Sequence, residues 1–207
     1  MAHRFAQIAF TDAVKSAQER YGSRAVYRRL DTGGGTHDEL GAAEAGFIAG
    51  RDSFYMASVS ETGWPYVQHR GGPPGFLRVL GPRTLGFADF RGNVQYVTLG
   101  NVSKNDRVAL ILMDYANRRR LKILGRLRSV DAAEADPELL RQVEAADYRA
   151  RVERVMLIEV EAFDWNCPQH ITPRFTEAEV AGRMAPLKAR IEELERRLGE
   201  SEKGAAP

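Results

Sequence analysis

Residues 54–93 read FYMASVSETGWPYVQHRGGPPGFLRVLGPRTLGFADFRGN, and this stretch decides the fold. Small and apolar residues over 54–59 predict a buried strand, and Glu61-Thr62-Gly63 predicts a short turn after it. The next strand, over 64–70, begins apolar and becomes strongly polar at its end. Two more short strands are expected over 76–80 and 84–88, with Gly81-Pro82 as the turn between them.

The same stretch predicts an anion site. The second strand ends in Gln68-His69-Arg70, and a glycine- and proline-rich loop over 71–75 follows it. The stretch itself ends in residues 89–93, where Asn93 is placed to cap a helix running to about Leu99. The free N–H groups at the start of a helix favour phosphate and other anions. Capping alone would also explain Asn93, and Arg70 could be a surface arginine at a strand end.

The remaining strands complete a mainly β protein. The continuous apolar run over 107–113 predicts a strand buried on both faces, and the alternation over 121–130 predicts a strand with one wet face. A last strand is expected over 154–164. Six or seven strands joined mostly by short turns, without regular alternation with helices, disfavour a doubly wound parallel sheet. We therefore predict an antiparallel β-barrel with flanking helices, in the α+β class.

Helices are expected at both ends of the chain and once between strands. Their predicted ranges are 11–21, capped by Thr11 and ended by Gly22, then 39–49, 131–151 and 177–199. The chain is expected to form one domain, with a helical segment over 1–50, the barrel over 51–175, a C-terminal helix over 176–199 and a disordered tail over 200–207. A narrow apolar seam on the C-terminal helix predicts that it docks on the barrel or pairs with a partner helix.

Bulk properties exclude several classes of protein. The composition is 43% hydrophobic and 28% charged, and a net charge of +2 is too small to favour nucleic acid, despite the basic run over 118–122. The single cysteine, Cys167, excludes an intrachain disulfide and a thiolate zinc site, which fits a reducing cytoplasm. No stretch approaches about 18 apolar residues, so no membrane span is expected. The N-terminus lacks the pattern of a signal peptide.

Long motifs make the chain resemble a known family. They are the run from Asp52-Ser53-Phe54-Tyr55 through ETGWPYVQHRGGPPGFLRVL, then LGFADFRGN, GNVSKNDRVALILMD, RRRLKILGRLRSV and DWNCPQHITPR. Together they resemble the pyridoxamine 5′-phosphate oxidase-like flavoproteins over roughly residues 47–174. This resemblance implies an FMN-binding split β-barrel of six or seven strands, and a homodimer with two FMN sites at the subunit interface.

The resemblance also implies which residues contact FMN. At the end of the second strand these are Gln68, His69 and Arg70. In the later loop and helix start they are Ala88, Asp89, Phe90, Arg91, Gly92, Asn93 and Gln95. From the other subunit, the strand that follows the central apolar one would contribute Arg119, Arg120 and Lys122. The loop that covers the flavin would contribute Trp165 and Gln169, with His170 as the candidate proton donor.

The implied activity is flavin-mediated transfer of a hydride or electrons to or from an unidentified small molecule, with NAD(P)H as a possible donor. The chain departs from the true oxidase at Gly92-Asn93, where that enzyme has an Arg/Lys pair, and it lacks the Arg-Leu-His-Asp-Arg type of C-terminus. Pyridoxamine phosphate is therefore not the expected substrate. A carrier or sensor of flavin or haem without turnover is the alternative, because fold does not fix function. A deazaflavin in place of FMN also stays open.

Overall fold

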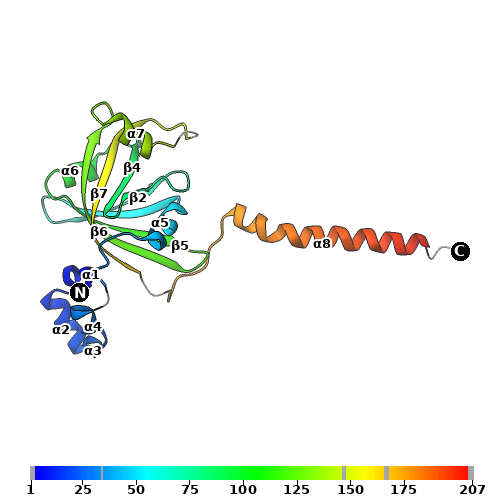
Figure 1. Ribbon diagram of the computed structural model, residues 1–207, viewed down its shortest axis with the longest axis horizontal. Coiled ribbons are helices and arrows are strands. Elements are labelled where there is room, and N and C mark those ends of the chain that lie inside the picture. The colour runs from blue at the N-terminus through cyan, green and yellow to red at the C-terminus, as the bar shows by residue number, and fades with distance from the viewer. Residues whose placement is uncertain (1–2, 34, 146–147, 166–167, 205–207) are drawn as a thin grey trace.

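Seven strands form one antiparallel sheet in the order β2-β1-β5-β6-β7-β4-β3 (Figure 1). The computed structural model describes residues 3–33, 35–145, 148–165 and 168–204. The strands are β1 (Ser53–Val59), β2 (Pro65–Gly71), β3 (Arg78–Gly81), β4 (Thr84–Phe90), β5 (Arg107–Asp114), β6 (Arg119–Asp131) and β7 (Val152–Trp165). The sheet is strongly bent, and the predicted mainly antiparallel fold is confirmed.

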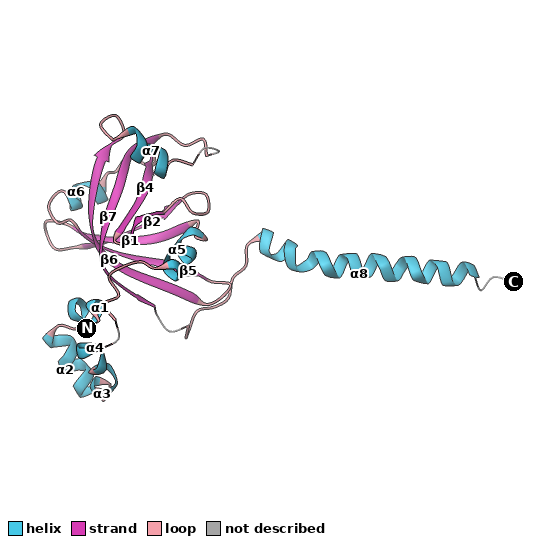
Figure 2. Cartoon of the chain, viewed as in Figure 1, coloured by secondary structure: helices cyan, strands magenta, loops and turns pink. Residues whose placement is uncertain are grey.

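Helices surround the sheet and extend from it (Figure 2). They are α1 (Arg4–Ala9), α2 (Asp12–Arg20), α3 (Arg24–Tyr27), α4 (Arg29–Thr32), α5 (Ala42–Ala49), α6 (Val97–Val102), α7 (Pro137–Val143) and α8 (Glu177–Gly204). The first four gather at one end of the sheet, and α8 projects away from it (Figure 1). Thr11 caps α2 as predicted, because its hydroxyl accepts a hydrogen bond from the N–H of Val14. None of the described helices is long and apolar enough to cross a bilayer.

The core is built from the inward faces of the strands. On β1, Phe54 and Met56 are almost fully buried while Tyr55 between them is exposed, which is the period-2 pattern of a strand. The ring of Phe54 stacks on Phe76 and meets the ring of Phe87 edge to face. These contacts hold the polar end of β2 and the end of β4 in fixed positions around one side of the barrel.

Two long strands carry the sheet around its bend. The β6–β7 register shifts between Leu124 and Gly125, as at a β-bulge. A Cβ atom at Gly125 would lie 2.5 Å from the carbonyl oxygen of Glu159, so only glycine fits this close approach. Because β7 is 14 residues long, its two ends lie in different parts of the molecule.

The structure corrects three predictions that were made from the sequence. The helix predicted over 131–151 is wrong in extent: β6 continues to Asp131 and α7 spans only Pro137–Val143. The β6–β7 ladder outcompetes helix formation up to Asp131, and the Asp136 carboxylate caps the short helix at its proline. No helix is predicted between the ranges 11–21 and 39–49, but the structure has α3 and α4 there. Finally, β5 is not buried on both faces, since alternate residues of it are only half-buried.

The C-terminal helix is longer than predicted. It continues to Gly204, so the tail expected to be disordered from residue 200 is helical that far, and residues 205–207 lie outside the described part of the chain. The predicted docking on the barrel is not made within this chain, because α8 projects into solvent (Figure 1). Its apolar residues are 44–66% exposed.

Candidate functional site

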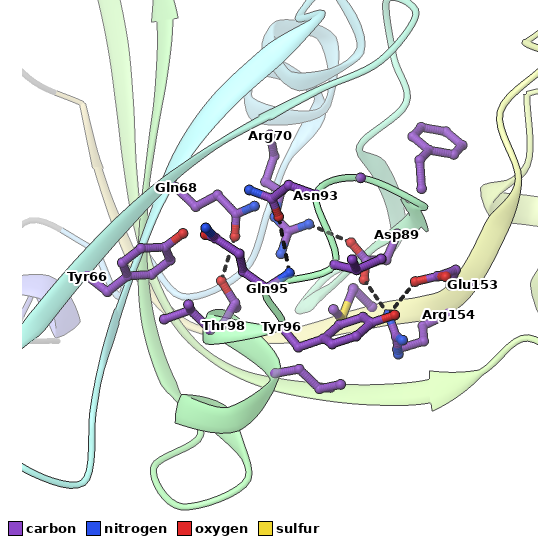
Figure 3. A pocket seen from close by; sticks show the side chains of 16 residues that line it. Tyr66, Gln68, Arg70, Asp89, Asn93, Gln95, Tyr96, Thr98, Glu153 and Arg154 are labelled. Carbon is purple, nitrogen blue, oxygen red and sulfur yellow. Dashed lines mark hydrogen bonds and ion pairs between the residues drawn. The ribbon is translucent and has the colours of Figure 1, made fainter.

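A polar cavity of about 220 Å³ lies between β2, β4, β7, α6 and the loop that precedes α6 (Figure 3). Strand alternation brings Tyr66, Gln68 and Arg70 of β2 to this cavity from one face of the strand. The other polar residues that line it are Asp89, Asn93, Gln95, Tyr96, Thr98, Glu153 and Arg154.

Two arginines converge on one buried carboxylate in this cavity. Asp89 is 7% exposed and accepts hydrogen bonds from Arg70 Nη1, and from Arg154 Nη1 at 3.1 Å. Asp89 and Arg154 are opposite each other in the β4–β7 ladder. Burial acts to lower the pKa of Arg154, but hydrogen bonds with Asp89 and Tyr96 outweigh it and raise the pKa above the usual arginine value. The Arg154 guanidinium is therefore a fixed cation.

The same cluster closes the barrel. In the sheet order, β2 is one edge strand and β4 lies next to the other edge, with four strands between them. The ion pair of Arg70 with Asp89 thus connects the two ends of the sheet directly. Because the side chains of Arg70 and Asp89 are only 15% and 9% exposed, water screens this interaction weakly.

Gln68 is held by a hydrogen bond from α6. The hydroxyl of Thr98 donates to Gln68 Oε1 at 2.8 Å, and Thr98 is 2% exposed. The α6 helix is in turn fixed to β1, because Asn101 Nδ2 donates to the Ser58 hydroxyl at 3.0 Å. With its oxygen occupied, Gln68 has its amide NH₂ group left to donate to a ligand in the cavity.

The loop before α6 has a strained backbone. Val94 and Tyr96 have φ angles of 54° and 53°, in the left-handed region that a β-branched residue such as valine strongly disfavours. The Arg154 guanidinium lies over the Tyr96 ring, 4.9 Å from its centroid, and this contact holds the loop. Strain of this kind is concentrated at ligand-binding sites in proteins.

The predicted capping role of Asn93 is wrong. The helix begins at Val97, and Tyr96 at its N-cap position gives no side-chain hydrogen bond. Asn93 Oδ1 instead accepts from the N–H of Gln95 at 3.3 Å inside the loop. The physical reason is the left-handed backbone at residues 94 and 96, which delays the helix. Asn93 still lines the cavity.

The predicted FMN contacts divide into two groups, and the first lies at the cavity. Its members are Gln68, Arg70, Asp89, Phe90, Gly92, Asn93 and Gln95. Three neighbours in sequence are elsewhere. His69 points to the other face of β2 and meets the Tyr55 ring, Ala88 is 2% exposed in the core, and exposed Arg91 points toward Glu153.

The second group lies at the far end of β6 and β7. Trp165 Nε1 donates a hydrogen bond to Glu44 Oε1 at 2.7 Å. The Arg119 guanidinium lies over the Trp165 ring, 4.7 Å from its centroid. Arg120 lines a surface pocket with them, whereas Lys122 lies near the Phe5 ring. Gln169 and His170 are exposed in the following loop.

These two groups lie toward opposite ends of β7. Arg154 and Trp165 are eleven residues apart on β7. At ~3.3 Å per residue, the strand separates them by up to ~36 Å.

Sequence reasoning missed several residues of the cavity. Tyr66 shares a strand face with Gln68, so its two-residue spacing could have revealed it. Thr98 of α6 and Glu153 and Arg154 of β7 carried no such signal, because only the complete fold brings them to the cavity beside β2. Among the described residues no group of three metal-ligating side chains is found.

Comparisons with known proteins agree on the fold. The sequence model of the family described as pyridoxamine 5′-phosphate oxidase matches residues 40–166. HupZ from Group A Streptococcus is 15% identical with a TM-score of 0.50, covering 66% of this chain and 99% of its own. No curated protein is similar enough in sequence to count as a relative.

Two further solved structures are similar to this chain at lower TM-scores. A putative pyridoxamine 5′-phosphate oxidase from Lactobacillus delbrueckii is 17% identical with a TM-score of 0.48, covering 61% of this chain and 94% of its own. An FMN-binding protein from Syntrophomonas wolfei is 12% identical with a TM-score of 0.44, covering 75% of this chain and 96% of its own. At such identities these likenesses concern the fold alone.

Proposed function

The chain belongs to the pyridoxamine 5′-phosphate oxidase family, and on that basis we propose that it is an FMN-dependent oxidoreductase that works as a homodimer. The proposed reaction class is transfer of a hydride or electrons between FMN and a small molecule. NAD(P)H is the proposed electron donor. The departure at Gly92-Asn93 argues against pyridoxamine phosphate as the substrate.

One observation carries the proposal. Arg70 Nε is buried and has no hydrogen-bond partner among the residues that the structure describes, although the other end of its guanidinium is held by Asp89. A buried donor without an acceptor is costly, and a phosphate oxygen in the cavity would satisfy it. Asp89 keeps the guanidinium in a fixed orientation, so little side-chain entropy is lost when an anion binds.

The other residues at the cavity fit the polar parts of FMN. Arg70 would hold the phosphate with Arg154 behind it, and the free amide NH₂ of Gln68 would donate to the ribityl chain or the flavin edge. When bound, FMN supplies the redox-active ring, which is the part of the chemistry that protein side chains cannot provide. The strained loop at Val94 and Tyr96 would keep water from the phosphate end of the cavity.

The outer face of the sheet supports the homodimer. Tyr55 of β1 and Val67 of β2 are 41% and 61% exposed, and they lie on the same face as half-buried Ile111 of β5. The run over 107–113 reads as a strand buried on both faces, which one chain alone does not provide. A second copy packed on this face would supply the missing burial.

A second copy would also complete the site. Arg120 Nε is a further buried donor without a partner in the described part of the chain. Arg120 lies at the start of β6, in the group that contains Arg119 and Trp165. In a two-fold dimer this group, with Trp165, would reach the cavity of the partner subunit. His170, exposed in the next loop, is the proposed proton donor from the same side.

The test is the visible absorption spectrum of the purified protein, before and after anaerobic addition of NADPH. A flavin spectrum that bleaches supports the reductase. Arg70→Ala should lower FMN affinity by about 10- to 100-fold, the equivalent of one charge-assisted hydrogen bond. Arg128→Ala, an exposed arginine of β6 outside the cavity, should leave it unchanged.

Three outcomes would contradict parts of the proposal. Full flavin retention by Arg70→Ala would mean that the phosphate lies elsewhere. Bound flavin that neither NADPH nor other reductants reduce at a useful rate would favour the carrier. A haem spectrum, or no uptake of added FMN, would remove FMN as the cofactor.

A further inference from the structure

The α8 helix carries an apolar seam that no described residue of this chain covers. Its side chains recur at alternating spacings of four and three residues: Val180, Met184, Leu187, Ile191, Leu194 and Leu198. All six are 44–66% exposed. This is the a/d repeat of a coiled coil, in which a narrow seam on one helix packs into an identical seam on another. Six half-exposed apolar side chains on one helix indicate a partner.

The charges that flank the seam select the partner and its direction. Arg183, Arg190 and Arg197 follow one flank at seven-residue spacing, and Lys188 and Glu195 follow the other. In an antiparallel pair like flanks meet, so arginines would face arginines. In a parallel, in-register pair the flanks cross, and Arg190, which also pairs with Glu193 of its own helix at 2.5 Å, would face the glutamate at 195 of the second copy. Charge complementarity therefore favours a parallel pair of identical helices.

One flank contact of the parallel pair is unfavourable, and the structure shows how it is relieved. Arg183 would approach the lysine at 188 of the second copy. Its guanidinium instead lies 4.2 Å from the ring centroid of Phe175 in its own chain. A cation over an aromatic face is an attractive contact that draws the arginine toward the helix start and away from position 188.

Other features of α8 agree with this partner. Pro186 lies inside the helix at a position facing away from the seam, where it removes one backbone hydrogen bond and favours a bend but puts no side chain into the seam. Acidic and basic side chains are nearly balanced along α8, seven against six. An amphipathic helix that binds anionic membranes has a strongly basic polar face, so a membrane surface is a poor match.

We propose that α8 pairs with α8 of a second copy of this chain as a parallel, in-register, two-stranded coiled coil. The pairing surface is the apolar seam, and Arg190 with Glu195 sets the orientation. This interface is separate from the outer face of β1, β2 and β5. It joins two barrels through a helix that projects away from its own barrel, and it raises the effective concentration of one barrel near the other.

The experiment is disulfide cross-linking in the full chain, with Cys167→Ser as the background. Leu194→Cys places a thiol in the seam, where paired helices bring the two Cα atoms within disulfide range, about 4.4–6.8 Å. Ala189→Cys places the matched thiol on the opposite face of the same helix. In a glutathione redox buffer, the seam variant should give at least about tenfold more linked dimer than the control. Equal yields, or no linked dimer from the seam variant, would overturn the proposal.

Charge exchange tests the orientation in the Leu194→Cys chain. Glu195→Arg would place an arginine opposite Arg190 of the second copy and should lower the cross-linking yield by about fivefold, because two symmetric contacts change from attraction to repulsion. Arg190→Glu combined with Glu195→Arg should restore the yield. A loss that the double variant does not restore would overturn the parallel register, and helical circular dichroism checks that each variant keeps α8.

Discussion

Neutralising Asp89 should loosen the barrel where its two edges meet. Asp89→Asn keeps the size of the side chain and removes its charge, which now compensates Arg70 and Arg154. The side chains of these arginines are only 15% and 12% exposed, so water cannot take over this role. The carboxylate is also the point at which β2 is joined to β4 across the split in the sheet.

The magnitude follows from the two hydrogen bonds that Asp89 accepts. Each is charge-assisted and worth about 1.5–3 kcal/mol, against about 0.5–1.5 kcal/mol for a neutral amide oxygen. Arg70 binds Oδ1 and Arg154 binds Oδ2, so the asparagine keeps one neutral acceptor and turns an NH₂ donor toward the other arginine. One hydrogen bond weakened and one lost, with two guanidinium groups then repelling each other, give about 2–4 kcal/mol. For a domain of this size that is a fall in melting temperature of about 5–15 °C.

The assay is thermal unfolding followed by circular dichroism in phosphate-free buffer, with and without added phosphate. Phosphate should stabilise Asp89→Asn more than the unchanged protein, because the variant no longer has a carboxylate competing for the arginines. Asp106→Asn is the matched control, since its ion pair with Arg126 is half-exposed, and its melting temperature should hardly change. Equal melting of Asp89→Asn and the unchanged protein, or an equal response to phosphate, would refute this reasoning.

Three further predictions concern the supports of the site and the barrel. Thr98→Val removes the hydroxyl that donates to Gln68 and should cost about 1 kcal/mol in urea unfolding; no loss would mean that this buried hydrogen bond contributes nothing. Gly125→Ala should cost about 1–3 kcal/mol or more, because its Cβ would lie 2.5 Å from a backbone carbonyl oxygen, whereas Gly92→Ala, with open space around it, should cost little in the same measurement. Burial and a neighbouring imidazole lower the pKa of His3 in the folded state, so its contribution is present above the unfolded value of about 6.5 and is lost as pH falls through the folded pKa. His3→Gln should flatten the fall in stability between pH 8 and pH 5, and an unchanged profile would contradict that assignment.

The strands were predictable because their signals are local. Turn residues such as Glu61-Thr62-Gly63 and Gly81-Pro82 separate apolar runs, and the structure has a strand on each side of both turns. The helix expected over 131–151 failed because its first residues have partners that only the fold supplies. Asp131 pairs with Arg154 in the β6–β7 ladder, and the sequence around residue 131 does not predict this pairing.

The site residues were likewise predictable only where their signal is local. Gln68 and Arg70 share a strand face by simple alternation, and both line the cavity. Asp89 lies opposite Arg154 because of the register of β4 against β7, and this register cannot be predicted from the local sequence. The position of Trp165 could not be predicted either, because the local sequence does not indicate that it lies at the end of β7 opposite the cavity.

The division of the site along β7 has a consequence for any activity of this chain. If the cavity is completed by the group around Trp165 of a second copy, ligand affinity and dimerisation are thermodynamically coupled, and each strengthens the other. Dilution would then release ligand as it separates the barrels. A coiled coil of α8 would oppose that release without contacting the ligand, because it keeps the second barrel near the first. The helix that projects furthest from the cavity would in this way help to keep the cavity occupied.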